Sequence, residues 1–299
     1  MTAETSRRAS VLATLALLAV TATWGSTFFL IKDLLDRVPV ADFLAVRFTI
    51  AAAALFLVAP RAVARLSPQA RRRGVALGLV YGAAQLLQTA GLGHTSASVS
   101  GFVTGMYVVI TPLFAALLFR TRVDRTAWIA VGLATGGLAL LSLQGLSVGL
   151  GESLTLVAAA LYALHIVGLG AWSVPDDALG LSVLQISVIA VVCWAGAVPE
   201  GVVLPVSGRD WASMLYMALV AGALALLAQT WAQGHMSATR AAVVMTMEPV
   251  FAAGFAVALG GESPTARMVA GGALVVVAMY LSELGPRHGR DAEVTHLVT

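Results

Sequence analysis

Two similar stretches organise this chain: Gln88-Thr-Ala-Gly-Leu-Gly-His-Thr-Ser-Ala97 and Gln229-Thr-Trp-Ala-Gln-Gly-His-Met-Ser-Ala238. They share six of ten positions, and the second begins nearly half of the 299-residue chain after the first. A second pair follows in the same order and at a similar offset, Pro112-Leu-Phe-Ala-Ala116 and Pro249-Val-Phe-Ala-Ala253. Two matches in the same order indicate an internal repeat, in which each half of the chain carries one copy of a common design.

The chain around these stretches is too apolar for a soluble protein. Hydrophobic residues make up 59% of it and charged residues only 11%, and the mean hydropathy is +0.89. Soluble domains carry about 25% charged residues to cover a water-exposed surface, and disordered chains are more polar still. Cys193 is the single cysteine, which excludes a disulfide framework and a cysteine-based metal site. The composition therefore predicts a protein embedded in the lipid bilayer.

Ten stretches are long enough to cross the membrane as helices, which takes about 20 apolar residues each. They are 11–31, 40–59, 75–93, 97–119 and 126–143 in the first half, and 152–170, 178–198, 211–233, 240–259 and 267–284 in the second. They lack the alternation of a transmembrane β-barrel. We therefore expect an all-α membrane protein with ten transmembrane helices. Five-helix repeats would occupy 11–145 and 146–284, between short tails at 1–10 and 285–299.

Arginine and lysine predict the orientation of these spans, because they accumulate in cytoplasmic connections. With the N-terminus inside, the outer connections hold only Lys32, Arg37, Arg209 and Arg267. The inner connections and tails hold thirteen: Arg7, Arg8, Arg61, Arg65, Arg71, Arg72, Arg73, Arg120, Arg122, Arg125, Arg240, Arg287 and Arg290. Both termini are therefore expected on the cytoplasmic side of the cell's inner (cytoplasmic) membrane. The apolar run after Arg8 is expected to be the first span and not a cleaved leader, since nine more spans follow it.

Each half has five spans, an odd number, so the second half must enter the membrane from the opposite face. The two repeats are then inverted. Inverted repeats are typical of secondary transporters, which open to either side around a site near the middle of the membrane. Gene duplication without alternating access would leave the same pattern, and the repeat alone does not separate the two.

Five short motifs occur in order: Ala22-Thr-Trp-Gly-Ser-Thr27, Val46-Arg-Phe48, the paired Gly-His-x-Ser-Ala elements, Met247-Glu-Pro-Val-Phe-Ala252 and Gly260-Gly-Glu262. They resemble motifs of the drug/metabolite transporter superfamily, and the last two resemble in particular its EamA family. The resemblance covers essentially the whole chain. It implies a ten-helix bundle that exports small metabolites, amino acids or drugs. The chain departs from the family at Phe119-Arg120-Thr-Arg122, where Gly-Glu often follows the fourth helix.

Glu248 is the sharpest candidate for mechanism. It lies about nine residues into the ninth span, or roughly 13 Å by helix rise, directly before Pro249. A carboxyl group at that depth could exchange protons, which makes protons a candidate partner. Its role could instead be structural, because Pro249 frees the carbonyl of Met245 and a protonated carboxyl could bind it.

Other polar groups within the spans are candidates for binding a small-molecule substrate. Arg47 needs a partner, which could be Glu248, a substrate carboxylate or a backbone carbonyl, unless it extends outward to the membrane surface. His165 could accept a proton, donate to substrate or bind a neighbouring carbonyl. Amides in apolar helices must bond across helices or into a cavity, and Tyr and Trp rings suit a mostly apolar pocket, although ordinary packing explains them equally well. The expected substrate-binding residues are Trp24, Arg47, Gln85, Gln88, Tyr107, Tyr162, His165, Gln229 and Trp231.

Several features bound the function. His94 and His235 have equivalent places at helix ends and are expected to cap or hinge, because no carboxylate or cysteine shares their spacing; no metal and no cofactor are expected. Without a nucleotide-binding loop, energy must come from an ion gradient, exchange or downhill flow. We therefore expect a secondary transporter working by alternating access, or alternatively an uncoupled facilitator or channel. No clustered acid–base constellation suggests an enzyme, and the scattered arginines do not suggest nucleic-acid binding.

A stripe of glycines leaves the oligomeric state open. Gly74, Gly78 and Gly82 recur every four residues on the third span, and such faces let helices approach closely. The stripe could serve packing and movement within one chain, or it could form a dimer interface.

Overall fold

The computed structural model describes residues 3–119, 125–142, 149–197 and 201–284, and every regular element in them is helical. The first half contains α1 (Ala3–Leu35), α2 (Val40–Val58), α3 (Ala62–Arg65), α4 (Pro68–Gly93), α5 (Ala97–Thr104), α6 (Tyr107–Phe119) and α7 (Arg125–Ser142). The second half contains α8 (Leu150–Trp172), the 3-10 turn η1 (Pro175–Asp177), α9 (Ala178–Ala197), α10 (Gly208–Ala218), the π-helix η3 (Leu219–Leu224), α11 (Ala225–Gln233), α12 (Ala238–Met245), α13 (Met247–Ala258) and α14 (Ala266–Leu284). The predicted all-α fold is confirmed.

Eight helical segments of the described chain are long and apolar enough to cross a membrane. They are Arg8–Leu35, Val40–Val58, Pro68–Gly93, Ala97–Leu118, Leu150–Trp172, Pro175–Ala197, Gly208–Gln233 and Ala238–Ala258. Two shorter apolar helices, Trp128–Gly137 and Ala266–Leu281, occupy the fifth and tenth predicted spans. The count of ten spans therefore stays a prediction. The arginines expected at 120, 122, 287 and 290, the boundary at 145–146 and the tail 285–299 lie outside the described residues.

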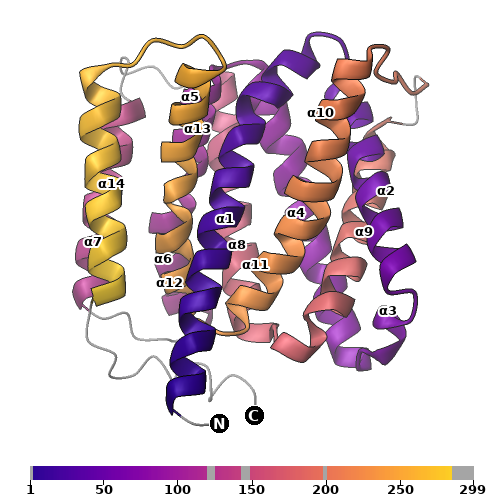
Figure 1. Ribbon diagram of the computed structural model, residues 1–299, viewed down its shortest axis with the longest axis horizontal. Helices are drawn as coiled ribbons and strands as arrows, with labels where there is room; N and C mark the ends of the chain where they lie inside the picture. The colour runs from indigo at the N-terminus through magenta and orange to yellow at the C-terminus, as the bar shows by residue number, and fades with distance from the viewer. Residues whose placement is uncertain (1–2, 120–124, 143–148, 198–200, 285–299) are drawn as a thin grey trace.

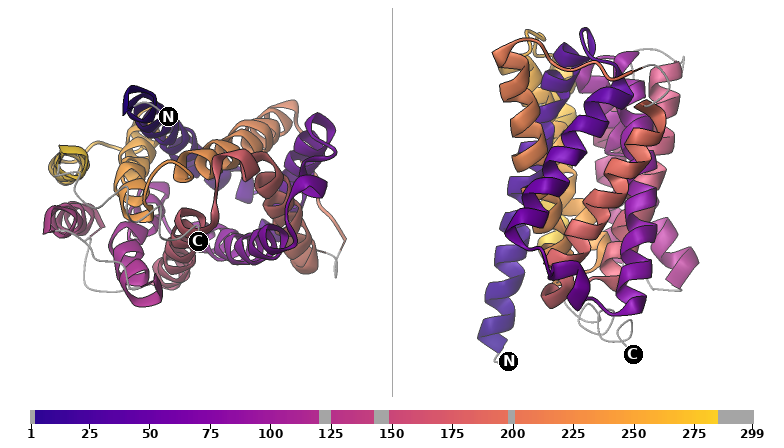
Figure 2. Two further views of the ribbon diagram at one scale, coloured as in Figure 1. Left: turned by 90° about the horizontal axis from the view of Figure 1, so that it is seen from below. Right: turned by 90° about the vertical axis from the view of Figure 1, so that its right-hand side faces the viewer.

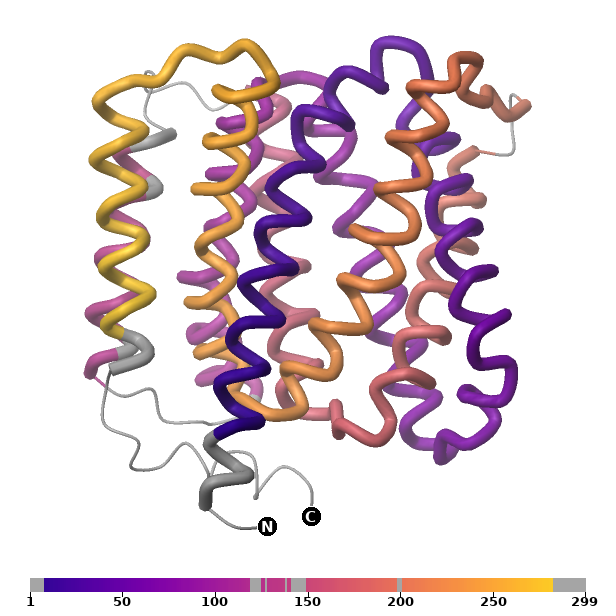
Figure 3. Tube along the Cα trace, viewed as in Figure 1, coloured from indigo at the N-terminus to yellow at the C-terminus, as the bar shows by residue number. Residues whose placement is uncertain are grey.

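The helices stand side by side in a bundle, and corresponding helices of the two halves lie together at its edges. α7 packs against α14 at one edge, and α2 packs against α9 at the opposite edge (Figures 1 and 2). The Cα trace in Figure 3 shows that α1 starts at the end of the bundle toward which α14 runs. Between the two edges, the first span of each half lies against the other half.

The contacts across the centre come in matched sets. α8 packs against α4, α5 and α6 of the first half, while α1 packs against α11, α12 and α13 of the second. In each case the first span of one half contacts the third and fourth spans of the other. The two halves are therefore interlocked, and the interface between them runs through the middle of the bundle.

The third spans of the two halves differ by a single insertion. Ser67 caps α4 by accepting a bond from the amide of Ala70, and Ser207 caps α10 in the same way, at an offset of 140. At Gln88 and Gln229 the offset is 141. The π-helix η3 lies between these two points, and such bulges accommodate an inserted residue within an α-helix while leaving carbonyls free to bind elsewhere. The insertion therefore distinguishes the second half from the first.

The fourth spans are broken at equivalent positions. α5 ends at Thr104 and α12 ends at Met245, again at an offset of 141, and the chain turns before the next helix begins. At this offset Tyr107 is equivalent to Glu248. Pro112 and the proline at 249 then fall four positions out of register, so their match in sequence marks corresponding helices and not equivalent positions.

The glycine stripe of α4 is covered by α9. A Cβ on Gly78 would come within 2.7 Å of the Val188 Cβ atom, and a Cβ on Gly74 or Gly82 would also meet branched side chains of α9. The stripe therefore serves packing within this chain.

Candidate functional site

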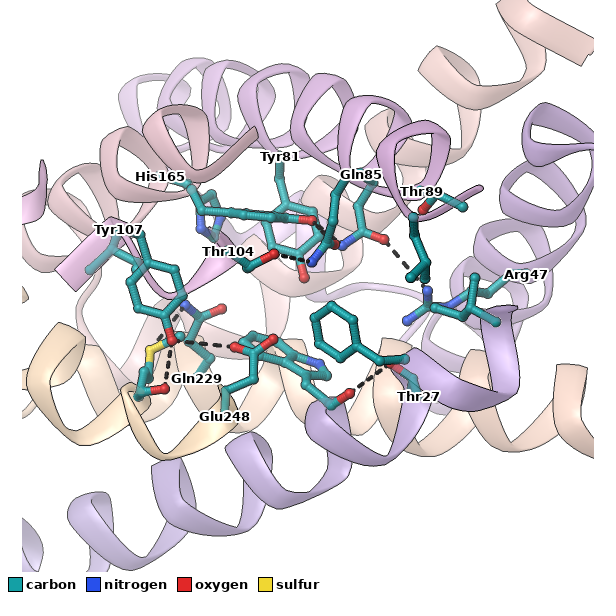
Figure 4. A pocket seen from close by; sticks show the side chains of 18 residues that line it. Thr27, Arg47, Tyr81, Gln85, Thr89, Thr104, Tyr107, His165, Gln229 and Glu248 are labelled. Atoms are coloured by element: carbon teal, nitrogen blue, oxygen red, sulfur yellow. Dashed lines mark hydrogen bonds between the residues drawn. The ribbon is translucent and has the colours of Figure 1, made fainter. Parts of the chain in front are cut away.

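A cavity of about 600 Å³, including its part open to solvent, lies in the bundle between the two halves (Figure 4). The lining residues are Trp24, Thr27, Phe28, Ile31, Arg47, Tyr81, Gln85, Gln88, Thr89, Leu92, Thr104, Tyr107, Tyr162, His165, Ile166, Gln229, Met245 and Glu248. Every residue expected from the sequence to bind substrate or protons is among them, with the exception of Trp231.

Trp231 lies on another face of α11. Its ring packs against His235, with the ring centroids 4.5 Å apart. Two positions along an α-helix correspond to a turn of about 200°, so Trp231 and Gln229 point in nearly opposite directions. The sequence placed both at the right depth, but depth alone does not distinguish the faces of a helix.

Three threonines that line the cavity were missed. Thr27 follows Trp24 by three positions and Thr89 follows Gln85 by four, so helical spacing to a known candidate could have found both. Thr104 has no such signal, because it reaches the cavity at the break between α5 and α6. The apolar lining residues also carry no mark that separates them from ordinary core.

Most of the lining consists of equivalent positions in the two repeats. Twelve of the 18 residues form six pairs at offsets of 138 or 141: Trp24/Tyr162, Thr27/His165, Phe28/Ile166, Gln88/Gln229, Thr104/Met245 and Tyr107/Glu248. The cavity is thus built around the interface of the two halves. The six remaining residues all belong to the first half: Ile31, Arg47, Tyr81, Gln85, Thr89 and Leu92.

Arg47 brings a buried positive charge to the cavity. It is 4% exposed, its Nε donates to the carbonyl of Met217 at 3.0 Å, and its Nη1 lies 3.5 Å from Oε1 of Gln85. The guanidinium also lies over the ring of Phe48, 5.0 Å from the centroid. No carboxylate among the described residues forms an ion pair with it. A buried charge of this kind is costly, so an anionic ligand group would complete the site.

The carbonyl that binds Arg47 is positioned by the π-helix. Met217 lies just before η3, and Ala221 within η3 offers its carbonyl to Nε1 of Trp24 at 2.8 Å. The one-residue insertion therefore supplies acceptors to a cavity residue from each of α1 and α2.

A directed chain of hydrogen bonds crosses the cavity from Arg47. A guanidinium can only donate, so the oxygen of Gln85 faces Arg47 and accepts from it. The Nε2 of Gln85 then donates to the hydroxyl of Tyr162 at 2.6 Å. That hydroxyl donates to Oε1 of Gln88 at 2.7 Å, and Nε2 of Gln88 donates to Thr104 at 3.0 Å. Both polar atoms of each glutamine are thus bonded within the protein.

The contacts of Tyr107 bear on the structural role considered for Glu248, which was to bind the carbonyl of Met245. Its hydroxyl donates to the carbonyl of Met245 at 2.6 Å and lies 3.3 Å from Oε2 of Glu248. The residue four positions after Met245 is Pro249, which has no N–H to offer that carbonyl. Tyr107 therefore supplies the bond that Glu248 would have supplied in a purely structural role. The carboxyl group is left at the cavity, 5% exposed.

His165 is paired with a side-chain amide and not with a backbone carbonyl. Its Nε2 lies 2.8 Å from Oε1 of Gln185, which is the repeat counterpart of Arg47. The ring of Tyr81 packs against it edge-on, with centroids 4.8 Å apart. The position that carries a charge in the first half is therefore a neutral, fully buried hydrogen-bonding group in the second.

The two ends of the bundle are closed differently. Near the N-terminal end of α1, a Cβ on Gly170 would come within 2.8 Å of Ala238, and Ser173 donates to the carbonyl of Thr230 at 2.8 Å. At the opposite end, Lys32 donates to the carbonyls that end α4, those of Leu92 and Gly93, at 3.0 and 3.1 Å. A long side chain thus joins α1 to α4 at one end, whereas direct helix contact seals the other.

Charged groups at the Lys32 end link further helices. Arg37 binds Asp210 and Asp33, each at 2.7 Å, and these hydrogen bonds raise the pKa of the Arg37 guanidinium. Ser98 at the start of α5 is hydrogen-bonded to Glu262 of the predicted Gly260-Gly-Glu262 motif. Among the described residues, no three His, Cys, Asp or Glu side chains are grouped so that they could hold a metal ion.

Comparison with known proteins gives consistent matches along the chain. The EamA-like transporter family matches residues 11–143 and 149–284, one match in each half. A chain from Archaeoglobus fulgidus described as an uncharacterized transporter is 29% identical over 273 residues, covering 91% of this chain and 86% of its own length.

Two further matches extend over nearly the full length. A probable amino-acid metabolite efflux pump of Salmonella typhimurium is 26% identical over 307 residues, covering 94% of this chain and 97% of its own. A solved crystal structure has a TM-score of 0.74 at 18% identity, covering 91% of this chain and 96% of its own, which supports the fold alone.

Proposed function

Because the chain belongs to the EamA-like transporter family of the drug/metabolite transporter superfamily, we propose that it is a secondary transporter that exports small molecules by alternating access. The family and the names of its relatives indicate a multi-pass membrane transporter and not an enzyme. The proposed arrangement has ten spans in two inverted repeats, 11–145 and 146–284, with both termini cytoplasmic. Its cargo would be small metabolites, amino acids or drugs, crossing the inner membrane.

The cavity at the interface of the two halves is the observation that carries this proposal. Alternating access needs a site at the interface of the two halves, so that exchanging the packing of equivalent helices exposes it to either side. Six equivalent pairs line this cavity, and its polar groups include a buried arginine and a buried glutamate. Ionisable groups at this depth are expensive and are characteristic of substrate and ion pathways.

The unpaired lining residues support a definite state in the cycle. Ile31, Thr89 and Leu92 lie toward the C-terminal ends of α1 and α4, and their repeat counterparts are Leu169, Thr230 and Gln233. These three counterparts are buried at the other end, where Gln233 donates to the carbonyl of Ile166 at 2.8 Å and Thr230 accepts from Ser173. In the proposed orientation the closed end is cytoplasmic, so we assign the structure to an outward-facing state.

Exchange of states would follow from reversing this asymmetry. The contacts of Gly170 and Ser173 would separate at the cytoplasmic end, while the outer ends of α1 and α4, joined by Lys32, would close further. Short helices, breaks at Thr104 and Met245, and the π-helix η3 provide places where such movement can occur.

Glu248 is the proposed coupling residue. A proton and a cationic substrate group would compete for its carboxylate, so that proton binding from outside releases substrate there. The proton would leave on the cytoplasmic side, where substrate would take its place. The position of Tyr107 supports this role, because it leaves Glu248 free of the structural bond to Met245.

Transport assays in proteoliposomes test the proposal and its alternative, an uncoupled facilitator. Cargo is first identified by a thermal-shift screen of amino acids, nucleobases and small amphiphiles, since a bound ligand stabilises the protein by mass action. Net uptake of that cargo into proteoliposomes that hold no internal cargo is then measured with and without a pH gradient. The coupled transporter concentrates cargo only with the gradient, whereas a facilitator equilibrates it in both cases.

The variant Glu248→Gln addresses coupling directly. We expect it to lose gradient-driven accumulation and to retain exchange of cargo. Glu152→Gln is the matched control, because Glu152 lies at the start of α8, bonded to Thr95, and does not line the cavity. Full uphill transport by Glu248→Gln would exclude the coupling role.

A further inference from the structure

The two equivalent glutamines Gln88 and Gln229 face the same cavity, but only one has an unused hydrogen-bonding atom. Oε1 of Gln88 accepts from Tyr162 and its Nε2 donates to Thr104. Gln229 is 1% exposed, its Nε2 donates to Gln233, and its Oε1 has no hydrogen-bond partner among the described residues. A buried acceptor without a partner is costly, and here it belongs to a residue that lines the site.

The neighbours of Gln229 fix which of its atoms is free. The carbonyl of Ile166 can only accept, so the amide nitrogen of Gln233 must face it, at 2.8 Å. The oxygen of Gln233 then faces Gln229 and accepts from its nitrogen at 3.0 Å. The amide of Gln229 cannot be turned over without losing this bond, so the unpaired atom is an acceptor and calls for a ligand N–H or O–H.

For His165, the neighbouring groups do not fix which ring nitrogen could accept a hydrogen bond from a ligand. Within the described part of the chain, Nδ1 of His165 and Nε2 of Gln185 both lack partners, and no third group orients the amide of Gln185. Both tautomers of the ring therefore fit this pair. The fixed acceptor is specific to Gln229.

A second acceptor lies near the Gln229 end of the cavity. The hydroxyl hydrogen of Tyr107 is directed to Met245, the closer of its two partners, so Glu248 retains accepting capacity. Figure 4 shows Gln229 and Glu248 toward one end of the cavity and Arg47 at the other. The acceptors thus gather at one end, and the donor-only guanidinium stands at the opposite end.

We propose that the cavity binds zwitterions and recognises the cationic group of the ligand by its N–H donors. This inference rests on the proposed function. An anionic group would bind Arg47, and a primary ammonium would bind Gln229 and Glu248. A primary ammonium has three donors, which matches two acceptors and leaves one for water or His165. The side chain of the ligand would lie against the apolar wall formed by Phe28, Ile31, Leu92 and Ile166.

Binding to the full-length purified protein tests this inference. The twenty common amino acids are screened by thermal shift, and the best binder is compared with its N-acetyl, carboxamide and N,N,N-trimethyl derivatives. We expect at least one apolar amino acid to bind and each derivative to bind about tenfold more weakly or worse, the usual effect of losing a hydrogen bond to a charged group. The trimethyl derivative keeps the positive charge but has no N–H.

Matched variants separate hydrogen bonding from the bulk of the added methyl groups. In Gln229→Met we expect the preference for the ammonium over the trimethyl compound to shrink by about tenfold. Gln69→Met is the matched control and should keep the preference, because Gln69 is exposed at the start of α4 and does not line the cavity. If Gln229→Met does not fold, the comparison of the ammonium and trimethyl compounds on the parent protein still tests the inference.

The outcomes distinguish this inference from the function on which it rests. If no amino acid binds, or if the trimethyl compound binds as well as its parent, the inference is wrong, even where proteoliposomes transport other small molecules. If amino acids bind with the expected selectivity but never cross the membrane in counterflow, the transport function is wrong and the inference stands.

Discussion

Replacing Tyr107 by phenylalanine removes one oxygen from the centre of the bundle. Tyr107 is 2% exposed, and its hydroxyl lies 2.6 Å from the Met245 carbonyl, whose regular helical donor is missing because Pro249 has no N–H. The variant leaves that buried carbonyl without its partner. A buried acceptor left without a donor lowers the free energy of unfolding by about 1–3 kcal/mol, whereas a hydrogen bond that water can replace contributes less.

The expected result is a lower thermal stability for Tyr107→Phe than for Glu248→Gln. Both proteins are compared with the parent in the same detergent by a fluorescence-based unfolding scan without ligand. Tyr280→Phe serves as the control, since Tyr280 is 61% exposed and the loss of its hydroxyl should leave stability nearly unchanged. Each scan is repeated at several pH values, because a neutral Glu248 can donate to the Met245 carbonyl when Tyr107 is absent. The loss in Tyr107→Phe should therefore be smaller at low pH.

A parent-like stability of Tyr107→Phe at every pH would refute this reasoning. So would a larger loss in Glu248→Gln than in Tyr107→Phe. Either result would return the structural role to Glu248 and remove the main support for its role in coupling.

Two further predictions concern helix packing and the Lys32 end of the bundle. Gly78→Ala should destabilise the protein by about 1–3 kcal/mol, because the added Cβ would lie 2.7 Å from Val188. Gly132→Ala is the control and should be neutral or stabilising by up to about 1 kcal/mol, since a Cβ there has no neighbour within 4 Å. Equal effects of Gly78→Ala and Gly132→Ala in unfolding scans would contradict the packing of α4 against α9. Lys32→Met should speed amide hydrogen exchange at the end of α4 and change ligand affinity less than twofold. Lys32→Arg can still donate to the carbonyls of Leu92 and Gly93, so it should keep the slow amide exchange of the parent at that end. Unchanged exchange in Lys32→Met would show that these bonds do not hold α1 to α4.

Hydrophobicity and depth predicted much of the site. Polar residues within apolar spans had to find partners in the interior, and this is why Arg47, Gln85 and Glu248 all face the cavity. Trp231 shows the limit of that argument, because it has the right depth but lies on another face of its helix. Rotation about the helix axis depends on packing, and a uniformly apolar helix carries little periodicity from which to infer it.

Features that depend on backbone geometry could not be predicted. Nothing in the composition of Leu219–Leu224 indicates a π-helix, yet the carbonyl of Ala221 within it and that of Met217 just before it each bind a cavity residue. The pairing of Pro112 with Pro249 was a match of sequence, and only the helix breaks at Thr104 and Met245 give the structural register. Register matters here, because it makes Tyr107 and Glu248 equivalent.

The equivalence of Tyr107 and Glu248 indicates how a symmetric scaffold acquires a directional site. Duplication alone would give the cavity the same side chains on both sides, whereas the equivalent positions here differ in chemistry. A phenol faces a carboxylate, an arginine has a buried glutamine as its counterpart, and one glutamine of an identical pair is left with a free acceptor. The repeats supply equivalent places around one axis, which alternating access requires. In the binding mode proposed above, the substitutions between them give the cavity an anion-binding end and a cation-binding end, which strict symmetry would forbid.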